Sequence, residues 1–261
     1  MSSIFSRIAL GLCICLAACA NPNSSNPSTP AAEPVVVGNP PAEGFNESGS
    51  DAKAIEIADQ VMEAMGGRQA WDNTHFIKWN FFGARTLTWD KFTGDVRIEE
   101  PKNERISLVN VHTGEGKVFE AGMELPADSA VNLLQRAKSV WINDSYWLVM
   151  PFKLKDSGVT LTYAGTDTLP GGAQADKLQL TFENVGDTPQ NKYVVWVDQA
   201  DHLVKQWAYF KDAQDEEPRF ITPWIEYAQY GEIQLSGNRG ERKLSDISVS
   251  EEMDASVFEG I

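Results

Sequence analysis

The three histidines are the side chains best suited to acid–base or metal chemistry near neutral pH. They lie far apart in the chain, at His75, His112 and His202, and no His-X-X-X-His spacing places two of them on one helix face. Glu99 and Glu100 are adjacent, so on a strand their carboxylates point to opposite faces and cannot work as an acid–base pair. The sequence therefore predicts no catalytic residues.

Two further patterns that could carry chemistry lack the setting they need. Gly114-Glu115-Gly116 does not join a strand to a helix, as a phosphate-binding loop does, and the chain has no Gly-X-Ser-X-Gly elbow. The acidic residues of 212–217 could offer oxygens to calcium, but their spacing fits no calcium loop. We expect no metal, no cofactor and no enzymatic activity. A hydrolase whose carboxylates meet only in the folded protein is the weakest of three functional hypotheses.

Aromatic side chains are the more informative group, because they concentrate in or beside segments with strand patterns. One interpretation is core filling, which an aromatic-rich sheet requires. The other is that some of them line a cavity for an apolar ligand. The residues that we predict for such a hydrophobic ligand site are Trp79, Phe81, Trp89, Tyr146, Trp147, Phe152, Trp196 and Trp207.

The N-terminus carries a signal for export. Arg7 is the only charged residue before position 33, and the apolar run of residues 8–18 is too short to span a bilayer, which takes roughly 20 residues. Leu16-Ala17-Ala18-Cys19 resembles the lipobox of bacterial lipoproteins. This resemblance implies that residues 1–18 are a signal peptide and that Cys19 is acylated. An ordinary cleavage near residues 17–20, or an uncleaved anchor, are the alternatives.

Cysteine content and charge limit the partners of the mature chain. Cys13 and Cys15 leave with the signal peptide, so a lipidated Cys19 leaves no thiol for a disulfide. The formal net charge of −15 repels phosphate backbones and excludes nucleic acid as a partner. We expect a monomer that contacts the membrane through its N-terminal lipid.

Residues 19–50 are rich in Asn, Ser, Pro and Gly and hold six of the chain's 13 prolines. This composition cannot bury enough apolar surface to order itself, so it predicts a disordered linker. Residues 51–261 are then a single folded domain.

Within that domain the hydrophobic period alternates between helix and strand. Apolar residues at helical spacing predict a helix over 51–65, ended by Gly66-Gly67, and another that starts at Pro126 and gives way to the aromatic stretch 143–152. Period-two segments fill 75–119 and 159–235. The order helix, meander, helix, meander indicates an α+β domain of antiparallel strands.

The last strong strands, Tyr193-Val194-Val195-Trp196-Val197-Asp198 and Leu203-Val204-Lys205-Gln206-Trp207, resemble the LolA and LolB superfamily. From about residue 52 onward the chain also looks like uncharacterised bacterial lipoproteins labelled outer-membrane lipoprotein-sorting proteins. The matching segments are 65–71, 143–147 and 151–154. The resemblance implies a half-open antiparallel β-barrel of about 10–11 strands, with two or more helices packed on its concave face.

The favoured hypothesis is a membrane-anchored protein of the bacterial envelope that binds or transfers a lipid or a lipoprotein acyl chain. Ala20, rather than aspartate, follows the cysteine, which favours the outer membrane, facing the periplasm. The alternative is a periplasmic or surface module that contacts protein or glycan and has no ligand cavity. A cavity between the helix of residues 50–65 and the sheet would distinguish the two.

Overall fold

A computed structural model describes residues 38–261, which belong to one compact unit. The predicted signal peptide, Cys19 and residues 20–37 of the predicted linker lie outside the described residues. None of the helices within residues 38–261 combines the length and hydropathy needed to cross a bilayer.

Helix α1 spans Ala52–Ala64 and buries one apolar face, which includes Ile57 and Val61. Asp51 occupies its N-cap position, and the chain leaves the helix through Gly66, whose φ is +116°. Only glycine adopts this backbone conformation readily, which explains why the helix ends where the sequence predicts. A short helix α2, Arg68–Asn73, follows and leads into the first strand.

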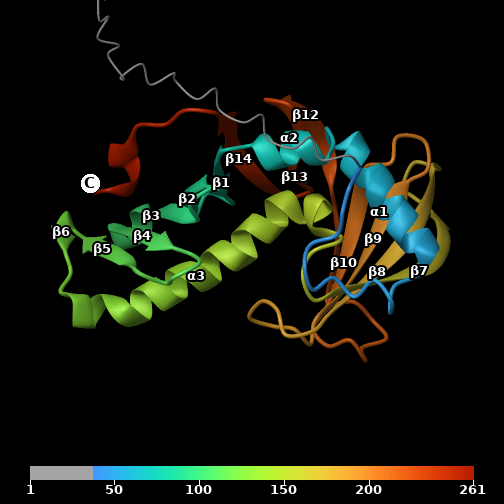
Figure 1. The fold of residues 1–261 in the computed structure, drawn as a ribbon, viewed down its shortest axis with the longest axis horizontal. Coiled ribbons are helices and arrows are strands. Elements are labelled where there is room, and N and C mark those ends of the chain that lie inside the picture. The colour runs from blue at the N-terminus through green and yellow to red at the C-terminus, as the bar shows by residue number, and fades with distance from the viewer. Residues whose placement is uncertain (1–37) are drawn as a thin grey trace, which may run out of the picture. The chain divides into compact units, whose positions relative to one another are not determined.

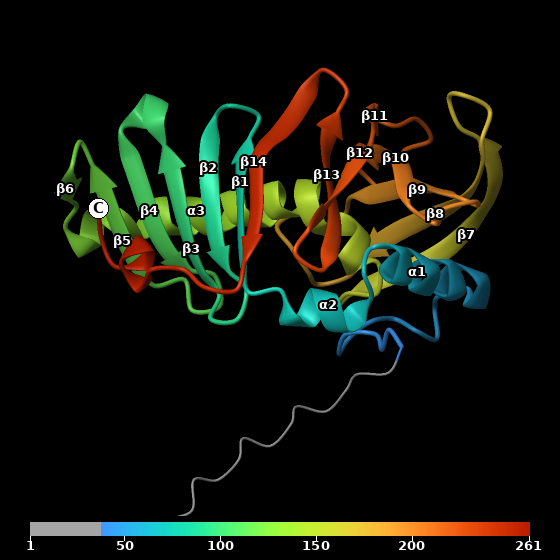
Figure 2. The same ribbon diagram turned by 90° about the horizontal axis from the view of Figure 1, so that it is seen from above.

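Nine antiparallel strands form the larger sheet, in the order β12-β13-β14-β1-β2-β3-β4-β5-β6 (Figures 1 and 2). In β3 alternate residues enter the core, as in a half-buried sheet, whereas no residue of β6 or β12 is buried. The strands are β1 Phe76–Phe81, β2 Arg85–Asp90, β3 Asp95–Glu100, β4 Arg105–Asn110, β5 Gly116–Glu120, β6 Met123–Glu124, β12 Ile225–Tyr230, β13 Ile233–Arg239 and β14 Arg242–Ser250.

Five antiparallel strands form the smaller sheet, in the order β11-β10-β9-β8-β7. Its strands run at a steep angle to those of the larger sheet (Figure 2). They are β7 Val159–Thr168, β8 Gln174–Phe182, β9 Lys192–Asp198, β10 Val204–Phe210 and β11 Phe220–Pro223.

The two sheets meet where one extended segment passes from the smaller to the larger. Only Trp224 separates β11 from β12, and its backbone N–H donates to Lys205 O at 2.7 Å. The Tyr227 hydroxyl donates to Val204 O at 2.9 Å and so ties β12 to β10. The α+β class and the antiparallel meanders predicted from the sequence are confirmed. The strands number 14 among the described residues, more than the 10–11 expected, because β6, β11, β12 and most of β14 have weak alternation.

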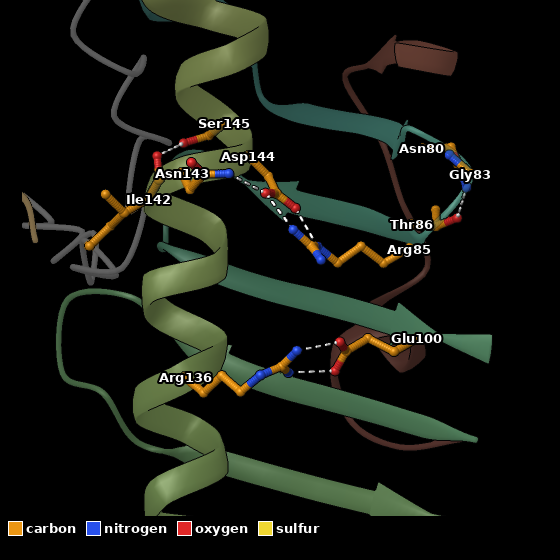
Figure 3. A network of polar contacts seen from close by, with 10 residues as sticks. All are labelled: Asn80, Gly83, Arg85, Thr86, Glu100, Arg136, Ile142, Asn143, Asp144 and Ser145. Atoms are coloured by element: carbon orange, nitrogen blue, oxygen red, sulfur yellow. Dashed lines mark hydrogen bonds and ion pairs between the residues drawn. The ribbon is translucent and has the colours of Figure 1, made fainter. Parts of the chain in front are cut away.

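Helix α3, Ala127–Val149, crosses one face of the larger sheet (Figures 1 and 2). It continues through the stretch where the sequence analysis ends the helix, and a 3-10 turn at Met150–Lys153 follows it. Two bidentate ion pairs hold it on the sheet (Figure 3). Arg85 of β2 donates to Asp144 at 2.5 and 2.8 Å, and Arg136 donates to Glu100 of β3 at 2.8 and 2.9 Å.

Residues 39–50, which the sequence analysis assigns to the linker, lie along the edge of β7 and the loop before it. The Ala42 N–H donates to Lys155 O, the Asn46 N–H to Val159 O and the Asp51 N–H to Leu161 O, all within 3.0 Å. This part of the predicted linker is therefore ordered on the domain.

Candidate functional site

A cavity of about 610 Å³ lies between the C-terminal half of α3 and the smaller sheet. The loop between β8 and β9 adds Val185, Gly186, Asp187 and Thr188 to its wall, and the segment between α3 and β7 adds Lys153, Asp156 and Ser157. Eight aromatic residues line the cavity: Trp141, Tyr146, Trp147, Phe182, Tyr193, Trp207, Tyr209 and Phe220.

Strand register explains why the sheet presents aromatic side chains here. Tyr193 of β9 pairs with Tyr209 of β10, and Tyr209 pairs with Phe220 of β11, so the three lie on one face. Trp207 is two residues from Tyr209 and shares that face. The helix supplies Tyr146 and Trp147 from the opposite side.

These aromatic rings pack on one another and form a continuous wall. The rings of Tyr193 and Trp207 are nearly parallel, at 5°, with centroids 5.0 Å apart. Trp147 stands perpendicular to Trp207, with centroids 4.8 Å apart, and stacks on Phe220 at 5.7 Å. Such offset and edge-to-face pairs stabilise beyond their buried area, so the wall is a rigid apolar surface.

Polar side chains also line the cavity. Lys153 forms an ion pair with Asp156, and both side chains are partly exposed. Asn191, which donates to Thr188 at 2.6 Å, is buried. Burial raises the pKa of Tyr193 to about 12 and that of Tyr146 well above its ordinary value of 10, so both phenols stay neutral. The arrangement suits a ligand with an apolar body and a polar end.

Arg239 of β13 fixes the end of α3 that carries Trp147. Its side chain is buried, its guanidinium lies 3.4 Å from the Trp224 ring centroid, and Nη2 donates to Trp147 O at 2.7 Å. A positive charge here satisfies a carbonyl of the last helical turn and complements the helix dipole. Burial lowers the pKa of Arg239 to about 9.

Three of the eight predicted ligand-site residues line the cavity: Tyr146, Trp147 and Trp207. Four others, Trp79, Phe81, Trp89 and Phe152, are buried in the main core. Trp196 lies on the opposite face of the smaller sheet, in a second cluster with Leu169, Ala208 and Phe210. These five residues fill hydrophobic clusters, as the core-filling interpretation predicts.

Five of the aromatic lining residues were not predicted from the sequence: Trp141, Phe182, Tyr193, Tyr209 and Phe220. Strand alternation contains a signal for one of them, because Tyr209 must share the face of Trp207. The cavity also lies elsewhere than expected. Helix α1 packs into the core with Ala54 and Val61 fully buried, and α3 forms the cavity wall instead.

The side chains that could carry acid–base or metal chemistry do not gather at one place among the described residues. The His75 ring is stacked between Phe76 and Phe92, and its Nε2 lies 3.1 Å from Asp90 Oδ1. Within residues 38–261, no three His, Cys, Asp or Glu side chains gather as ligands of one metal ion would.

No protein-family model matches the sequence, and no curated protein matches it either. Among solved structures, a DUF1329 family protein from Desulfovibrio piger is similar, with 12% identity and a TM-score of 0.43 over 78% of this chain and 96% of that one. A LolA superfamily protein from Nitrosomonas europaea has 9% identity and a TM-score of 0.33 over 78% and 96%. A complex of MucB with MucA(peri) gives 12% identity and a TM-score of 0.23 over 78% and 58%. The solved structures similar to this chain thus include a LolA superfamily protein.

Proposed function

We propose that this chain is a lipid-binding protein of the bacterial envelope, which takes the acyl chain of a lipid or lipoprotein into its aromatic cavity. The observation that carries the proposal is the cavity of about 610 Å³ with eight aromatic residues in its wall. This volume falls within the range of about 300–1,000 Å³ that is typical of small-molecule sites.

Burial of an alkyl chain is sufficient to drive such binding. Each methylene removed from water contributes about 0.8 kcal/mol, so a chain segment of about eight methylenes contributes about 6 kcal/mol before ordering costs. The head group would then lie near Lys153 and Asp156, the ion pair of the lining whose side chains are partly exposed.

We propose that the protein holds its ligand and does not transform it. No histidine lines the cavity within the part of the chain that the structure describes. Its charged side chains are Lys153 and Asp156, which are paired with each other, and Asp187. Transfer would then require only that apolar surface be uncovered and covered again.

The test uses residues 38–261, which form one compact unit with their own core. Native mass spectrometry of the purified protein should reveal co-purified lipid, and the apolar dye N-phenyl-naphthylamine should fluoresce on binding and be displaced by fatty acyl compounds. Trp207→Leu should weaken dye binding at least fivefold. Trp196→Leu is the matched control, because Trp196 faces the other side of the sheet. Absence of bound lipid together with absence of dye binding would refute the proposal.

The anchor is proposed from the sequence, since Cys19 lies outside the described residues. Cells fed an alkyne-labelled fatty acid should label the full chain, and the label should disappear in Cys19→Ala. Labelled material is expected in the outer-membrane fraction. Label that survives the substitution would contradict acylation of this cysteine.

The alternative, an interaction module for protein or glycan, assumes a groove filled by its own side chains. An open cavity beside the aromatic stretch of α3 favours the ligand-binding proposal over that one.

A further inference from the structure

The charged side chains that line the aromatic cavity do not balance. They are one basic residue, Lys153, and two carboxylates, Asp156 and Asp187, so the lining has a net charge of −1. Lys153 forms its ion pair with Asp156. The exposed Asp187 then has no basic side chain of the lining left to pair with it. The excess charge of the cavity is therefore negative and belongs to Asp187.

The two carboxylates come from segments that lie against each other. Asp156 precedes β7, and Asp187 follows β8. The Glu183 N–H at the start of the β8–β9 loop donates to Gly158 O at 2.9 Å, and a Cβ at Gly158 would lie 2.7 Å from the Val185 side chain. Both carboxylates therefore act on the same side of the cavity.

A second loop adds negative charge on this side. The β10–β11 loop contacts the β8–β9 loop, where the Ala213 N–H donates to Gln190 O at 2.8 Å. Residues 183–192 and 211–219 together carry six carboxylates and three basic side chains. Clefts with apolar walls focus the field of such charges, so the potential at this side favours a cation and opposes an anion.

Aromatic rings line the cavity next to these carboxylates. Phe182 ends β8 and directly precedes the acidic loop. Its ring lies edge-to-face with Tyr193, at 5.6 Å between centroids, and with Tyr146, at 6.4 Å. All three side chains are partly exposed and line the cavity. The face of an aromatic ring attracts a cation, and the attraction grows as water is removed.

We propose that the cavity selects amphiphiles whose head group carries an ammonium cation, with the alkyl chain against the aromatic wall and the ammonium beside Asp156 and Asp187. This inference rests on the proposed function and narrows its ligand to alkyl amines and quaternary ammonium compounds. It assigns Asp187 as the specificity-determining residue, because Asp156 is already neutralised by Lys153.

The test compares three soluble amphiphiles of equal chain length below their micelle concentrations: dodecyltrimethylammonium, neutral dodecyl maltoside and laurate. Displacement of N-phenyl-naphthylamine from residues 38–261, at about pH 8 where laurate is ionised, measures each affinity. The cation should bind tightest and laurate weakest, with a ratio of at least about fivefold between them. Asp187→Asn should lower this ratio by about three- to fivefold and leave the maltoside affinity within about twofold.

Two further variants change the charge of the lining in opposite directions. Lys153→Gln removes its one basic side chain and should raise the ratio of cation to laurate affinity. Asp156→Asn combined with Asp187→Asn leaves Lys153 as its one charged side chain and should reverse the ranking, so that laurate binds tighter than the cation.

Glu115→Gln is the matched control. It makes the same change in net charge as Asp187→Asn, and Glu115 is exposed in the β4–β5 turn of the larger sheet, outside the lining. It should leave the ratio within about twofold, because exposed charges far from the ligand are screened by salt. Trp207→Leu should weaken all three amphiphiles, as expected for binding in the aromatic cavity.

Three results would overturn the inference: laurate that binds the parent protein as tightly as the cation does, a ratio that Asp187→Asn and Glu115→Gln change equally, or a ratio that Lys153→Gln lowers. Failure of the dye and of all three amphiphiles to bind would instead refute the proposed function itself.

Discussion

The ion pair between Asp144 and Arg85 provides the sharpest test of how α3 is held on the larger sheet. The Asp144 side chain is fully buried and that of Arg85 is 19% exposed. Burial raises the pKa of Asp144 although the Arg85 guanidinium opposes the shift. The desolvation of this carboxylate therefore outweighs the attraction of its partner.

The expected effect of Asp144→Asn follows from that balance. The amide cannot neutralise the guanidinium, and one of its ends presents N–H groups to the donors of Arg85. Breaking a buried pair costs about 3–5 kcal/mol, and we expect about 3 because Arg85 retains some contact with water. For a domain of this size such a loss lowers the melting temperature by about 6–12 °C.

Removing both charges should behave differently. Arg85→Met combined with Asp144→Leu leaves no uncompensated charge and adds apolar contact, so its stability should lie within about 1 kcal/mol of the parent or above it. Urea unfolding, followed by tryptophan fluorescence, measures all three proteins. Lys243→Ala is the control, because its pair with Glu226 spans 3.9 Å between side chains more than 60% exposed and should contribute less than about 1 kcal/mol.

A loss below about 1 kcal/mol in Asp144→Asn would refute this reasoning. So would a double variant that is as unstable as Asp144→Asn or more so, because the cost would then come from packing and not from the unpaired charge.

Three further outcomes are expected. The hydrogen bond from Arg136 of α3 lowers the pKa of Glu100. The ion pair therefore stabilises the fold above the ordinary glutamate pKa of about 4.3, and this stabilisation is lost as the pH falls. Glu100→Gln should lower the urea midpoint at pH 7 and flatten the decline of that midpoint below about pH 5. Arg239→Met should reduce stability by about 2 kcal/mol and weaken dye binding, because the last turn of α3 loses its donor, and Arg239→Lys should not restore either urea midpoint or dye titration. Gly66→Ala should cost at least about 2 kcal/mol in urea unfolding, because φ is +116° and the added Cβ would lie 2.4 Å from Glu232 O.

Local periodicity was sufficient to predict the elements that have one apolar face. Helix α1 and the strands β1 and β3 carry such patterns, and most of their buried residues follow them. The strands at the junction of the sheets could not be predicted in this way. In β12 all six residues are exposed or half-buried, so what makes it a strand is its pairing with β13 and not its own sequence.

The candidate site was predictable only in part, because alternation shows which residues share a face but not what that face meets. Trp196 and Trp207 occupy neighbouring strands with equally strong patterns. In the register, Trp207 pairs with Val195 and Trp196 pairs with Gln206, so the two indoles point to opposite sides. Which side carries the cavity is decided by α3, which comes from another part of the chain.

The way in which α3 is held also indicates where a ligand enters. Two bidentate ion pairs fix the helix on the larger sheet, and Arg239 fixes its last turn. Displacing α3 would break all three contacts at once: each broken ion pair leaves a charge without its partner, and the Arg239 guanidinium loses one of its acceptors. The β8–β9 loop forms the other wall, and its residues Gly186 and Thr188 are exposed. Since its movement separates no buried ion pair, access to the cavity is expected on the side of this loop.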